Sequence, residues 1–302
     1  MFEGTQYRDH VRTAAGGDVA TLLTGETGAG KDFYAQWIHA NSPRREAPFV
    51  MINCAAITES LFESELFGHE KGAFTGAVAR TRGDLYEANN GTLFLNEIAE
   101  LPRTMQAKLL DVAETKQYAP VGSTIRQRSN FRLICATNQP LNTLQDGASL
   151  RRDLYYRINE LHIHIPPLRE RKEEVLPLAR TFAAALQPKR ELADETIDFL
   201  LCYGYPGNVR ELRHAVEHAV MNAGQETILR REHFPAAMLN HCTHLHDSPS
   251  LDEIETCHGK HVLLEMIKAC GGNKAEAARR LQISRKTLYE RLNALPKCKR
   301  DT

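Results

Sequence analysis

Short apolar runs alternate with stretches of helical composition over the first 172 residues. Runs that stop at a turn residue predict buried strands at Val19–Thr24, Phe49–Asn53, Thr92–Asn96, Arg132–Thr137 and Leu161–Ile165. Helical stretches such as Arg103–Thr115 separate most of these strands. Because strands that alternate with helices form a mostly parallel sheet, we expect an α/β domain over residues 1–172.

The pattern becomes all-helical after about Glu173. Asp194–Cys202 and Asn208–Asn222 are the strongest helical segments, and they predict a helical subdomain over residues 173–240. Two short polar clusters and Pro249 indicate a linker over residues 241–250. The remaining residues, 251–302, are again helical and form a second, small all-α domain.

Charge is distributed unevenly along the 302 residues, although the formal net charge is zero. Residues 259–302 contain eleven Lys and Arg against four Asp and Glu, a net charge of +7, so residues 1–258 carry −7. This asymmetry predicts a basic module that binds a polyanion. No run of about 18 apolar residues is present, so we expect no membrane span. Seven scattered cysteines are typical of a reducing cytoplasm.

A phosphate-binding loop follows the first predicted strand. Its residues are Gly25, Glu26, Thr27, Gly28, Ala29, Gly30 and Lys31. Backbone N–H groups of such a loop surround phosphates, and the lysine neutralises the terminal ones. A chance glycine loop is the alternative, but the strand before it and the helix after it favour phosphate binding. Asp32 stands where the general motif has a hydroxyl that binds metal.

The strand Thr92–Asn96 is expected to end in an acidic pair, an Asp that helps to hold Mg²⁺ and a Glu that orients the attacking water. Here the pair is Asn96 and Glu97. Glu97 can still act on water, but the neutral Asn96 amide offers magnesium only a weakened ligand. Three interpretations stay open: slowed hydrolysis with binding intact, a subunit that hydrolyses poorly or not at all alone, and an engineered trap.

A glycine-rich loop lies between these two motifs in the sequence. Its residues are Gly72, Ala73, Phe74, Thr75, Gly76 and Ala77. Glycines make such a loop mobile, and an exposed aromatic side chain is a contact group. The alternative is a tight turn with Phe74 packed into the core.

The basic C-terminal segment has the pattern of a helix-turn-helix. Ala275–Leu281 predicts a short helix, and Ser284 can cap the next one. Such a second helix enters the major groove of double-stranded DNA while flanking basic residues hold phosphates. The candidate DNA-binding residues are Asn273, Lys274, Ser284, Arg285, Lys286, Thr287, Tyr289 and Arg291. A helical hairpin that serves only dimerisation is the alternative.

Cys and His residues gather in and after the predicted linker. They are His241, Cys242, His244, His246, Cys257 and His258. Cys and His at short spacing can bind zinc. A polar linker that happens to be rich in histidine explains the same pattern.

Several motifs together resemble one family. They are Gly25–Lys31, Asn53–Ala56, Glu65–Glu70, Gly72–Ala77, Gly91–Ile98, Ala136–Asn138, Arg151–Arg157, Pro166–Arg171 and Tyr205–Leu212. The chain resembles the sigma-54-dependent transcriptional activators, the NtrC-type bacterial enhancer-binding proteins of the AAA+ class. Its C-terminal spacing resembles their Fis-type DNA-binding domain. The resemblance implies a P-loop ATPase core with a helical lid, ATP and Mg²⁺ as cofactors, and sigma-54 RNA polymerase and enhancer DNA as partners.

The resemblance also implies residue roles. Asn53 would pair with Glu97 as a switch, and Asn138 would sense the γ-phosphate. Arg151 and Arg157 would act in a neighbouring subunit's site as arginine fingers, while Arg210 would contact the nucleotide from the lid. Single-residue alternatives are a turn cap for Asn53 and solvated surface positions for the two arginines. Trans-acting fingers require a ring, which in this family is a hexamer, and the DNA-binding domain implies a dimer.

Three functions are compared at this point. The leading hypothesis is an ATP-driven activator that binds upstream DNA and remodels the sigma-54 polymerase closed complex through the loop Gly72–Ala77, whose residues would contact sigma-54. The second is a DNA-binding subunit that does not hydrolyse ATP, because of Asn96, in a mixed ring with a catalytic paralogue. The third is an unrelated AAA+ machine such as a helicase loader, against which the loop Gly72–Ala77 argues. Because no receiver domain precedes the ATPase, we expect control by a partner or by expression level, or else a truncated sequence.

Overall fold

The computed structural model describes residues 6–55, 58–186, 190–243 and 274. The chain divides into two compact units, which are described separately. The first unit contains the chain up to Glu174 together with Tyr205–Leu212, and the second contains Val175–Gly204 and the chain from Arg213 onward.

A five-stranded parallel sheet forms the centre of the first unit. Its strands are β1 (Thr21–Thr24), β2 (Phe49–Asn53), β5 (Thr92–Asn96), β8 (Arg132–Thr137) and β9 (Leu161–His164), in the order β2-β5-β8-β1-β9. The predicted α/β class is therefore confirmed. β1 begins two residues later than predicted, since Val19 is exposed, and β9 ends one residue earlier, just before Ile165 and Pro166.

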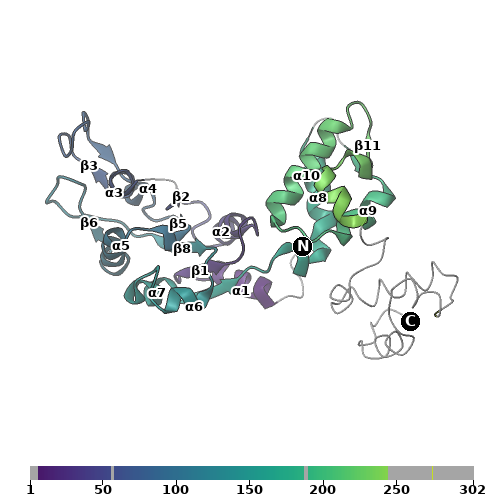
Figure 1. Cartoon of the computed structure of the whole chain (residues 1–302). Coiled ribbons are helices and arrows are strands. Elements are labelled where there is room, and N and C mark those ends of the chain that lie inside the picture. Colours follow the sequence, from purple (N-terminus) through teal and green to yellow (C-terminus); the bar gives the residue numbers. More distant parts are fainter. Residues whose placement is uncertain (1–5, 56–57, 187–189, 244–273, 275–302) are drawn as a thin grey trace. The chain divides into compact units, whose positions relative to one another are not determined.

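Helices cover both faces of this sheet. Along β5 the side chains alternate, so that Leu93 and Leu95 face one core and Phe94 faces the other. The Phe94 core is closed by α1 (Gln6–Ala15) and α2 (Lys31–Ala40). The opposite core is closed by α3 (Glu59–Phe67), α4 (Asp84–Glu87), α5 (Arg103–Thr115), α6 (Leu141–Gln145) and α7 (Arg152–Ile158). In Figure 1, α6 and α7 lie next to each other beside β1 and β8.

Two small hairpins extend from the sheet layer. β3 (Gly68–His69) pairs with β4 (Thr81–Arg82), and β6 (Gln117–Tyr118) pairs with β7 (Gln127–Arg128), both antiparallel. Three short 3₁₀ helices complete the unit: η1 (Ile98–Glu100), η2 (Leu168–Glu170) and η3 (Lys172–Glu174). The sequence pattern predicted none of these elements, because each is too short to show a period.

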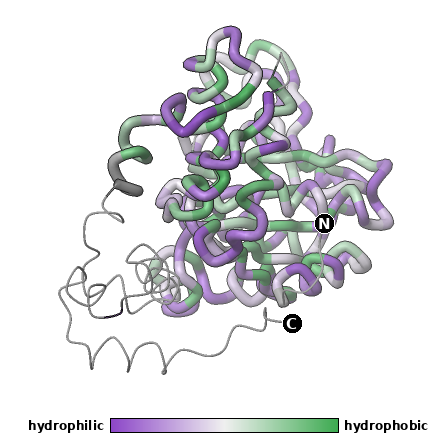
Figure 2. Tube along the Cα trace, turned by 90° about the vertical axis from the view of Figure 1, so that its right-hand side faces the viewer, coloured by the Kyte–Doolittle hydropathy of each residue, from purple (hydrophilic) through white to green (hydrophobic). Residues whose placement is uncertain are grey.

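The second unit is mainly helical. It contains α8 (Val175–Ala185), α9 (Asp194–Cys202), the larger part of α10 (Asn208–Asn222), η4 (Arg231–His233) and α11 (Ala236–Thr243), with β10 (Glu191–Leu192) parallel to β11 (Ile228–Leu229). Phe199 and Phe234 meet edge to face in its core, with ring centroids 5.5 Å apart. Green apolar stretches alternate with purple hydrophilic ones along the tube in Figure 2, as expected for amphipathic elements.

The predicted linker starts too early. Helix α11 continues to Thr243, so the first three residues of the range 241–250 are helical. No Gly or Pro interrupts this helix, and its Ala, Met and Leu residues favour continuation. The rest of that range lies outside the described residues.

No described helix has the length and apolarity that a bilayer crossing requires.

Arg132 is a charged residue inside the Phe94 side of the fold, only 1% exposed. Its Nη2 donates to the Ala14 carbonyl over 2.8 Å, while its Nε and Nη1 have no partner among the described residues. Burial lowers the pKa of this guanidinium, a sign that the charge is poorly compensated.

We therefore expect Arg132→Met to change the free energy of unfolding by less than about 1 kcal/mol, or to raise it, because an apolar side chain replaces an uncompensated charge. The matched core substitution Phe94→Ala should lower it by about 3–5 kcal/mol. Urea denaturation of both variants measures the difference. Equal losses in the two variants would contradict this account of Arg132.

Candidate functional site

Polar residues gather at the carboxyl edge of the parallel sheet. The loop Gly25–Lys31 follows β1, Glu97 follows β5, and Asn138 follows β8. Because β8 lies between β1 and β5, these three segments are neighbours at one edge. The carboxyl edge is where open α/β sheets bind their ligands.

Lys31 begins α2 and turns back into its own loop. Its Nζ donates to the carbonyls of Gly25 over 2.9 Å and Glu26 over 3.3 Å, and it lies 3.9 Å from Glu97 Oε1. Burial lowers the pKa of this ammonium, although the nearby Glu97 carboxylate opposes the shift. The ammonium thus lies inside the loop, within reach of phosphates that bind there.

Glu97 has a left-handed backbone conformation and a carboxylate that is held by hydrogen bonds. Its φ of 53° lies in the left-handed region, which is uncommon for a non-glycine residue and concentrates at functional sites. Asn96 Oδ1 accepts a 3.0 Å hydrogen bond from the Glu97 amide. Glu97 Oε2 in turn accepts a hydrogen bond from the backbone amide of Asn138 over 3.1 Å. The carboxylate is therefore held between β5 and β8.

Asn53 ends β2 and is a neighbour of Asn96 in the sheet register. Its Oδ1 accepts a 3.1 Å hydrogen bond from the Ala55 backbone amide. This is the bond expected if Asn53 caps a turn, which was the alternative to the switch role. Among the hydrogen bonds of the described residues, none joins the side chains of Asn53 and Glu97. The switch that pairs these two residues stays a prediction.

The first turn of α10 packs directly against the phosphate loop. Val209 donates its amide to the Gly28 carbonyl over 3.0 Å. A Cβ at position 28 would lie 2.4 Å from the Gly207 carbonyl, and φ there is 77°, so both space and conformation require glycine. Arg210, in the same turn, is close enough for its charge to oppose protonation of Lys31.

Glu26 is held by two residues to which sequence reasoning assigned no role. Arg169 makes a bidentate ion pair with Glu26, at 2.6 and 2.9 Å, and Asn208 Nδ2 donates to Glu26 Oε2 over 3.0 Å. The Arg169 bonds, followed by the Asn208 bond, lower the pKa of Glu26 to about 2. Both residues lie in motifs that carried the family resemblance, so the motifs marked the place but not the contacts.

A buried polar cluster supports the other end of the loop. Arg171 donates to the Ala29 carbonyl, and over 2.7 Å to Glu174 and 3.1 Å to the Tyr34 hydroxyl. Tyr7 on α1 donates to Glu174 over 2.6 Å. Burial raises the pKa of Glu174, but the Arg171 charge and the hydrogen bonds from Tyr7 and Arg8 outweigh it and lower the pKa below its ordinary value. The family motif Pro166–Arg171, which contains Arg171, was the sequence signal of this cluster.

The two candidate arginine fingers have partners in their own chain. Arg151, at the start of α7, pairs with Asp153 through Nε at 3.1 Å and Nη2 at 2.7 Å. Arg157, in the last turn of α7, pairs with Glu160 and donates to the Ala113 carbonyl over 3.1 Å. Since exposed ion pairs contribute little, the Arg151 pair can be exchanged cheaply for another partner. The trans roles stay predictions.

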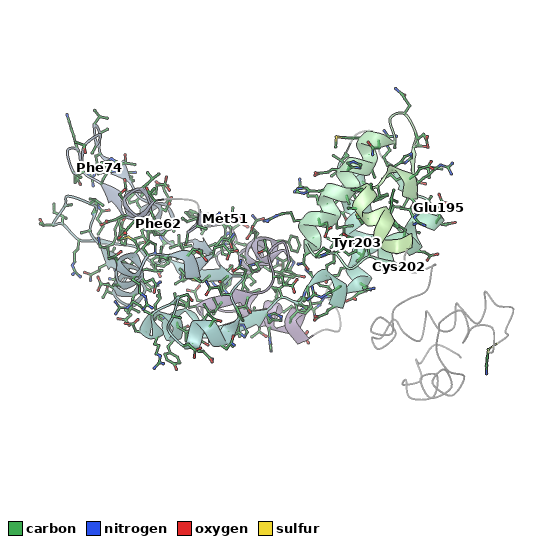
Figure 3. All side chains as sticks on the ribbon, in the orientation of Figure 1. Met51, Phe62, Phe74, Glu195, Cys202 and Tyr203 are labelled. Atoms are coloured by element: carbon green, nitrogen blue, oxygen red, sulfur yellow. The ribbon has the colours of Figure 1, made fainter. Side chains whose placement is uncertain are left out.

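The loop Gly72–Ala77 closes on itself between β3 and β4. Gly72 donates to the Ala77 carbonyl over 2.9 Å, and Ala77 donates to the Phe74 carbonyl over 3.0 Å. Phe74 is 45% exposed, so the alternative in which it packs into the core is wrong. Its ring meets the edge of His69 at 5.0 Å. Figure 3 shows Phe74 in the loop region beyond β3, away from the central strands.

A second loop, residues 119–126 between β6 and β7, lies beside the first. Glu70 donates to the Val121 carbonyl over 3.0 Å, and Val121 donates to the Gly68 carbonyl over 2.9 Å. Val78 and Ile125, next to the two loops, are 84% and 74% exposed. Sequence reasoning missed this second loop, since only its turn residues marked it.

Most of the predicted DNA-binding residues lie outside the described part of the chain. Lys274 is helical and exposed. The other candidates, Asn273, Ser284, Arg285, Lys286, Thr287, Tyr289 and Arg291, are outside it, as are His244, His246, Cys257 and His258 of the zinc hypothesis.

The sheet order, phosphate loop and carboxyl-edge residues define a nucleotide-binding domain of the AAA+ class. Residues 3–164 match the model of the Sigma-54 interaction domain, residues 169–250 that of an AAA+ ATPase lid domain, and residues 259–295 that of the Fis family of bacterial regulatory proteins. The chain belongs to the sigma-54 activator family.

Proteins of related sequence and solved structures point to the same family. The transcriptional regulatory protein ZraR of Klebsiella oxytoca is 42% identical over 297 residues, covering 94% of this chain and 66% of the relative. AlgB of Pseudomonas aeruginosa, an alginate biosynthesis regulatory protein, is 38% identical, covering 93% and 63%. A crystal structure of NtrX from Brucella abortus has a TM-score of 0.73 at 30% identity, covering 97% and 69%. The chain thus spans about two thirds of the relatives' length.

The low pKa of Glu26 predicts a pH dependence of stability. A depressed carboxyl pKa stabilises the fold above the unfolded value of 4.5, and this contribution disappears as the pH falls through the folded value of about 2. We expect Glu26→Gln to melt at a temperature only slightly below that of the wild type at pH 6, because solvent screens the exposed pair with Arg169, and this difference should close between about pH 4.5 and 2. Scanning calorimetry of both proteins measures this difference in melting temperature. Glu46→Gln, at an exposed ion pair with Arg45, is the control and should show no gap. A gap that persists at pH 2 would contradict the assignment.

Proposed function

We propose that this chain is an ATP-dependent activator that binds enhancer DNA and remodels the sigma-54 RNA polymerase closed complex. The observation that carries the proposal is the exposed Phe74, in a glycine-closed loop of the domain that holds a phosphate loop and the base Glu97. A crystal structure of NtrX in complex with ATP, 31% identical with a TM-score of 0.68, supports the nucleotide.

The chain's own residues supply most of the chemistry. The loop Gly25–Lys31 binds the phosphates, with the Lys31 ammonium meeting the terminal ones. Glu97, held by Asn138, orients the attacking water as general base. In a hexameric ring, Arg151 and Arg157 of a neighbouring subunit stabilise the charge of the transition state. Residues 259–295 bind DNA as a dimer.

Magnesium fits this site weakly. Asn96 Oδ1 already accepts from the Glu97 backbone amide and carries no charge, so the phosphates, together with the Glu97 and Asp32 carboxylates near Lys31, would provide the negative field for the ion. When bound with ATP, Mg²⁺ would neutralise charge on the phosphates. Asn96 therefore also favours the second candidate, a hydrolysis-deficient regulatory subunit of a mixed ring with a catalytic paralogue.

Turnover distinguishes the two candidates. We expect Asn96→Asp to raise the ATPase rate of the purified protein by roughly tenfold, about 1.4 kcal/mol, because Asp keeps the acceptor for the Glu97 amide and adds a charge for the metal. A steady-state phosphate-release assay measures the rate, with Glu97→Gln as the inactive control. Equal and robust rates for Asn96 and Asp would show that position 96 does not limit hydrolysis.

The contact loop is tested separately from the ATPase. We expect Phe74→Ala to reduce open-complex formation with sigma-54 polymerase by roughly 30-fold or more, about 2 kcal/mol, because a central aromatic contact is lost. ATP binding and DNA binding should be unchanged. Met221→Ala, which truncates another exposed apolar side chain, is the matched control. Full activation by the Phe74 variant would remove the loop from the mechanism.

A further inference from the structure

We propose that Asn208 is the positioning residue that holds the phosphate loop in its nucleotide-binding conformation. The inference rests on the proposed ATP-dependent function. Asn208 is completely buried, and all of its described side-chain bonds are well formed. Its Nδ2 donates to Glu26 Oε2 over 3.0 Å and to the Thr27 carbonyl over 3.1 Å, while its Oδ1 accepts from the Leu168 amide over 2.8 Å.

These bonds join three separate segments of the chain. Glu26 and Thr27 belong to the phosphate loop, Leu168 begins η2 after the edge strand, and Asn208 begins α10. One carboxamide therefore fixes where the loop stands relative to the first turn of α10. A buried amide whose two N–H donors and carbonyl oxygen all have partners is a specific connector, because each lost bond leaves a buried polar group unsatisfied.

The connection continues to the catalytic residues. Thr27 Oγ1 accepts from Asn138 Nδ2 over 3.3 Å, and the Asn138 amide donates to Glu97 Oε2 over 3.1 Å. Glu97 Oε1 lies 3.9 Å from Lys31 Nζ. Asn208 is thus one end of a continuous polar path that ends at the general base and the phosphate-binding lysine.

Arg169 also holds Glu26, but it is the weaker candidate. Both side chains of that ion pair are more than two fifths exposed, at 44% and 43%. Solvent screens such a pair, and its contribution is small. Asn208 is shielded from water, so its bonds to the same loop are the ones whose loss matters.

The backbone of Asn208 permits a clean test. Its φ of 55° is left-handed, a conformation that glycine adopts without strain. Asn208→Gly therefore removes the carboxamide while keeping the local backbone. We expect the Kd for ATP with Mg²⁺, measured by calorimetry on the full chain, to rise at least about tenfold, because three hydrogen bonds are lost. Asn90→Gly, at an exposed asparagine with φ of 62°, is the matched control and should bind like the wild type.

A second variant gives a readout that general loss of structure does not move. Asn208→Asp keeps the acceptor for Leu168 but places a carboxylate against Glu26. The other titratable groups near Glu26 are Arg169 on η2, His164 on β9 and Lys31 on α2, whose Nζ donates to the Glu26 carbonyl, and all three are common to variant and wild type. We expect the ATP affinity of the variant to be lowest relative to wild type at pH 8 and to recover as the pH falls, because the protonated acid can donate to Glu26 again.

Each outcome decides a separate point. ATP binding by Asn208→Gly equal to that of wild type overturns the inference alone. If Asn208→Gly loses its melting transition, the Asn208→Asp profile decides, and a ratio to wild type that does not change with pH overturns the inference. Failure of the wild type itself to bind ATP overturns the proposed function, and this inference with it.

Discussion

The hydrogen-bonding demand of one short loop organises the first unit. A loop that presents backbone N–H groups to phosphates cannot use them in a sheet or helix, so other contacts must fix its shape. Here Asn208 and Arg169 hold its beginning, and Arg171 holds the Ala29 carbonyl near its end. All three come from segments that follow the last strand of the sheet or begin α10. The parallel sheet provides the carboxyl edge at which the phosphate loop lies, and these later segments fix the conformation of that loop.

At the end of β5, the hydrogen bonds that fix Glu97 are present, whereas the negative charge expected at position 96 is absent. The contacts that position Glu97 are complete, since its amide and its carboxylate both have partners. The neutral Asn96 fills its structural place by accepting the Glu97 amide, as an aspartate would. What it does not supply is negative charge for a metal. Geometry and electrostatics at position 96 are thus separable, because a neutral side chain keeps the hydrogen bond that a charged one would also make.

The long elements could be predicted from the sequence, and the contacts between them could not. Strands β2, β5 and β8 have the predicted bounds because each is an apolar run that stops at a turn residue. Helices α5, α9 and α10 have the predicted bounds because they are long enough to show helical composition. The hairpins are too short for this, and the exposure of Phe74 depends on how its loop closes. The role of Asn208 was hidden for another reason, since a buried amide bonded to distant segments leaves no local pattern. Motifs marked where such residues stand, while tertiary geometry alone shows what they hold.

The edge contact between His69 and Phe74 has a consequence for how freely the Phe74 ring moves. His69 is itself fixed by a 2.7 Å hydrogen bond with Ser64 on α3, so the ring rests against a stationary support. An aromatic edge contact contributes about 1 kcal/mol, which leaves the ring detached in roughly one molecule in six at equilibrium. Thermal fluctuation alone therefore presents a free aromatic tip. The aromatic tip is thus free for contact in a fraction of the molecules, without any rearrangement elsewhere in the fold.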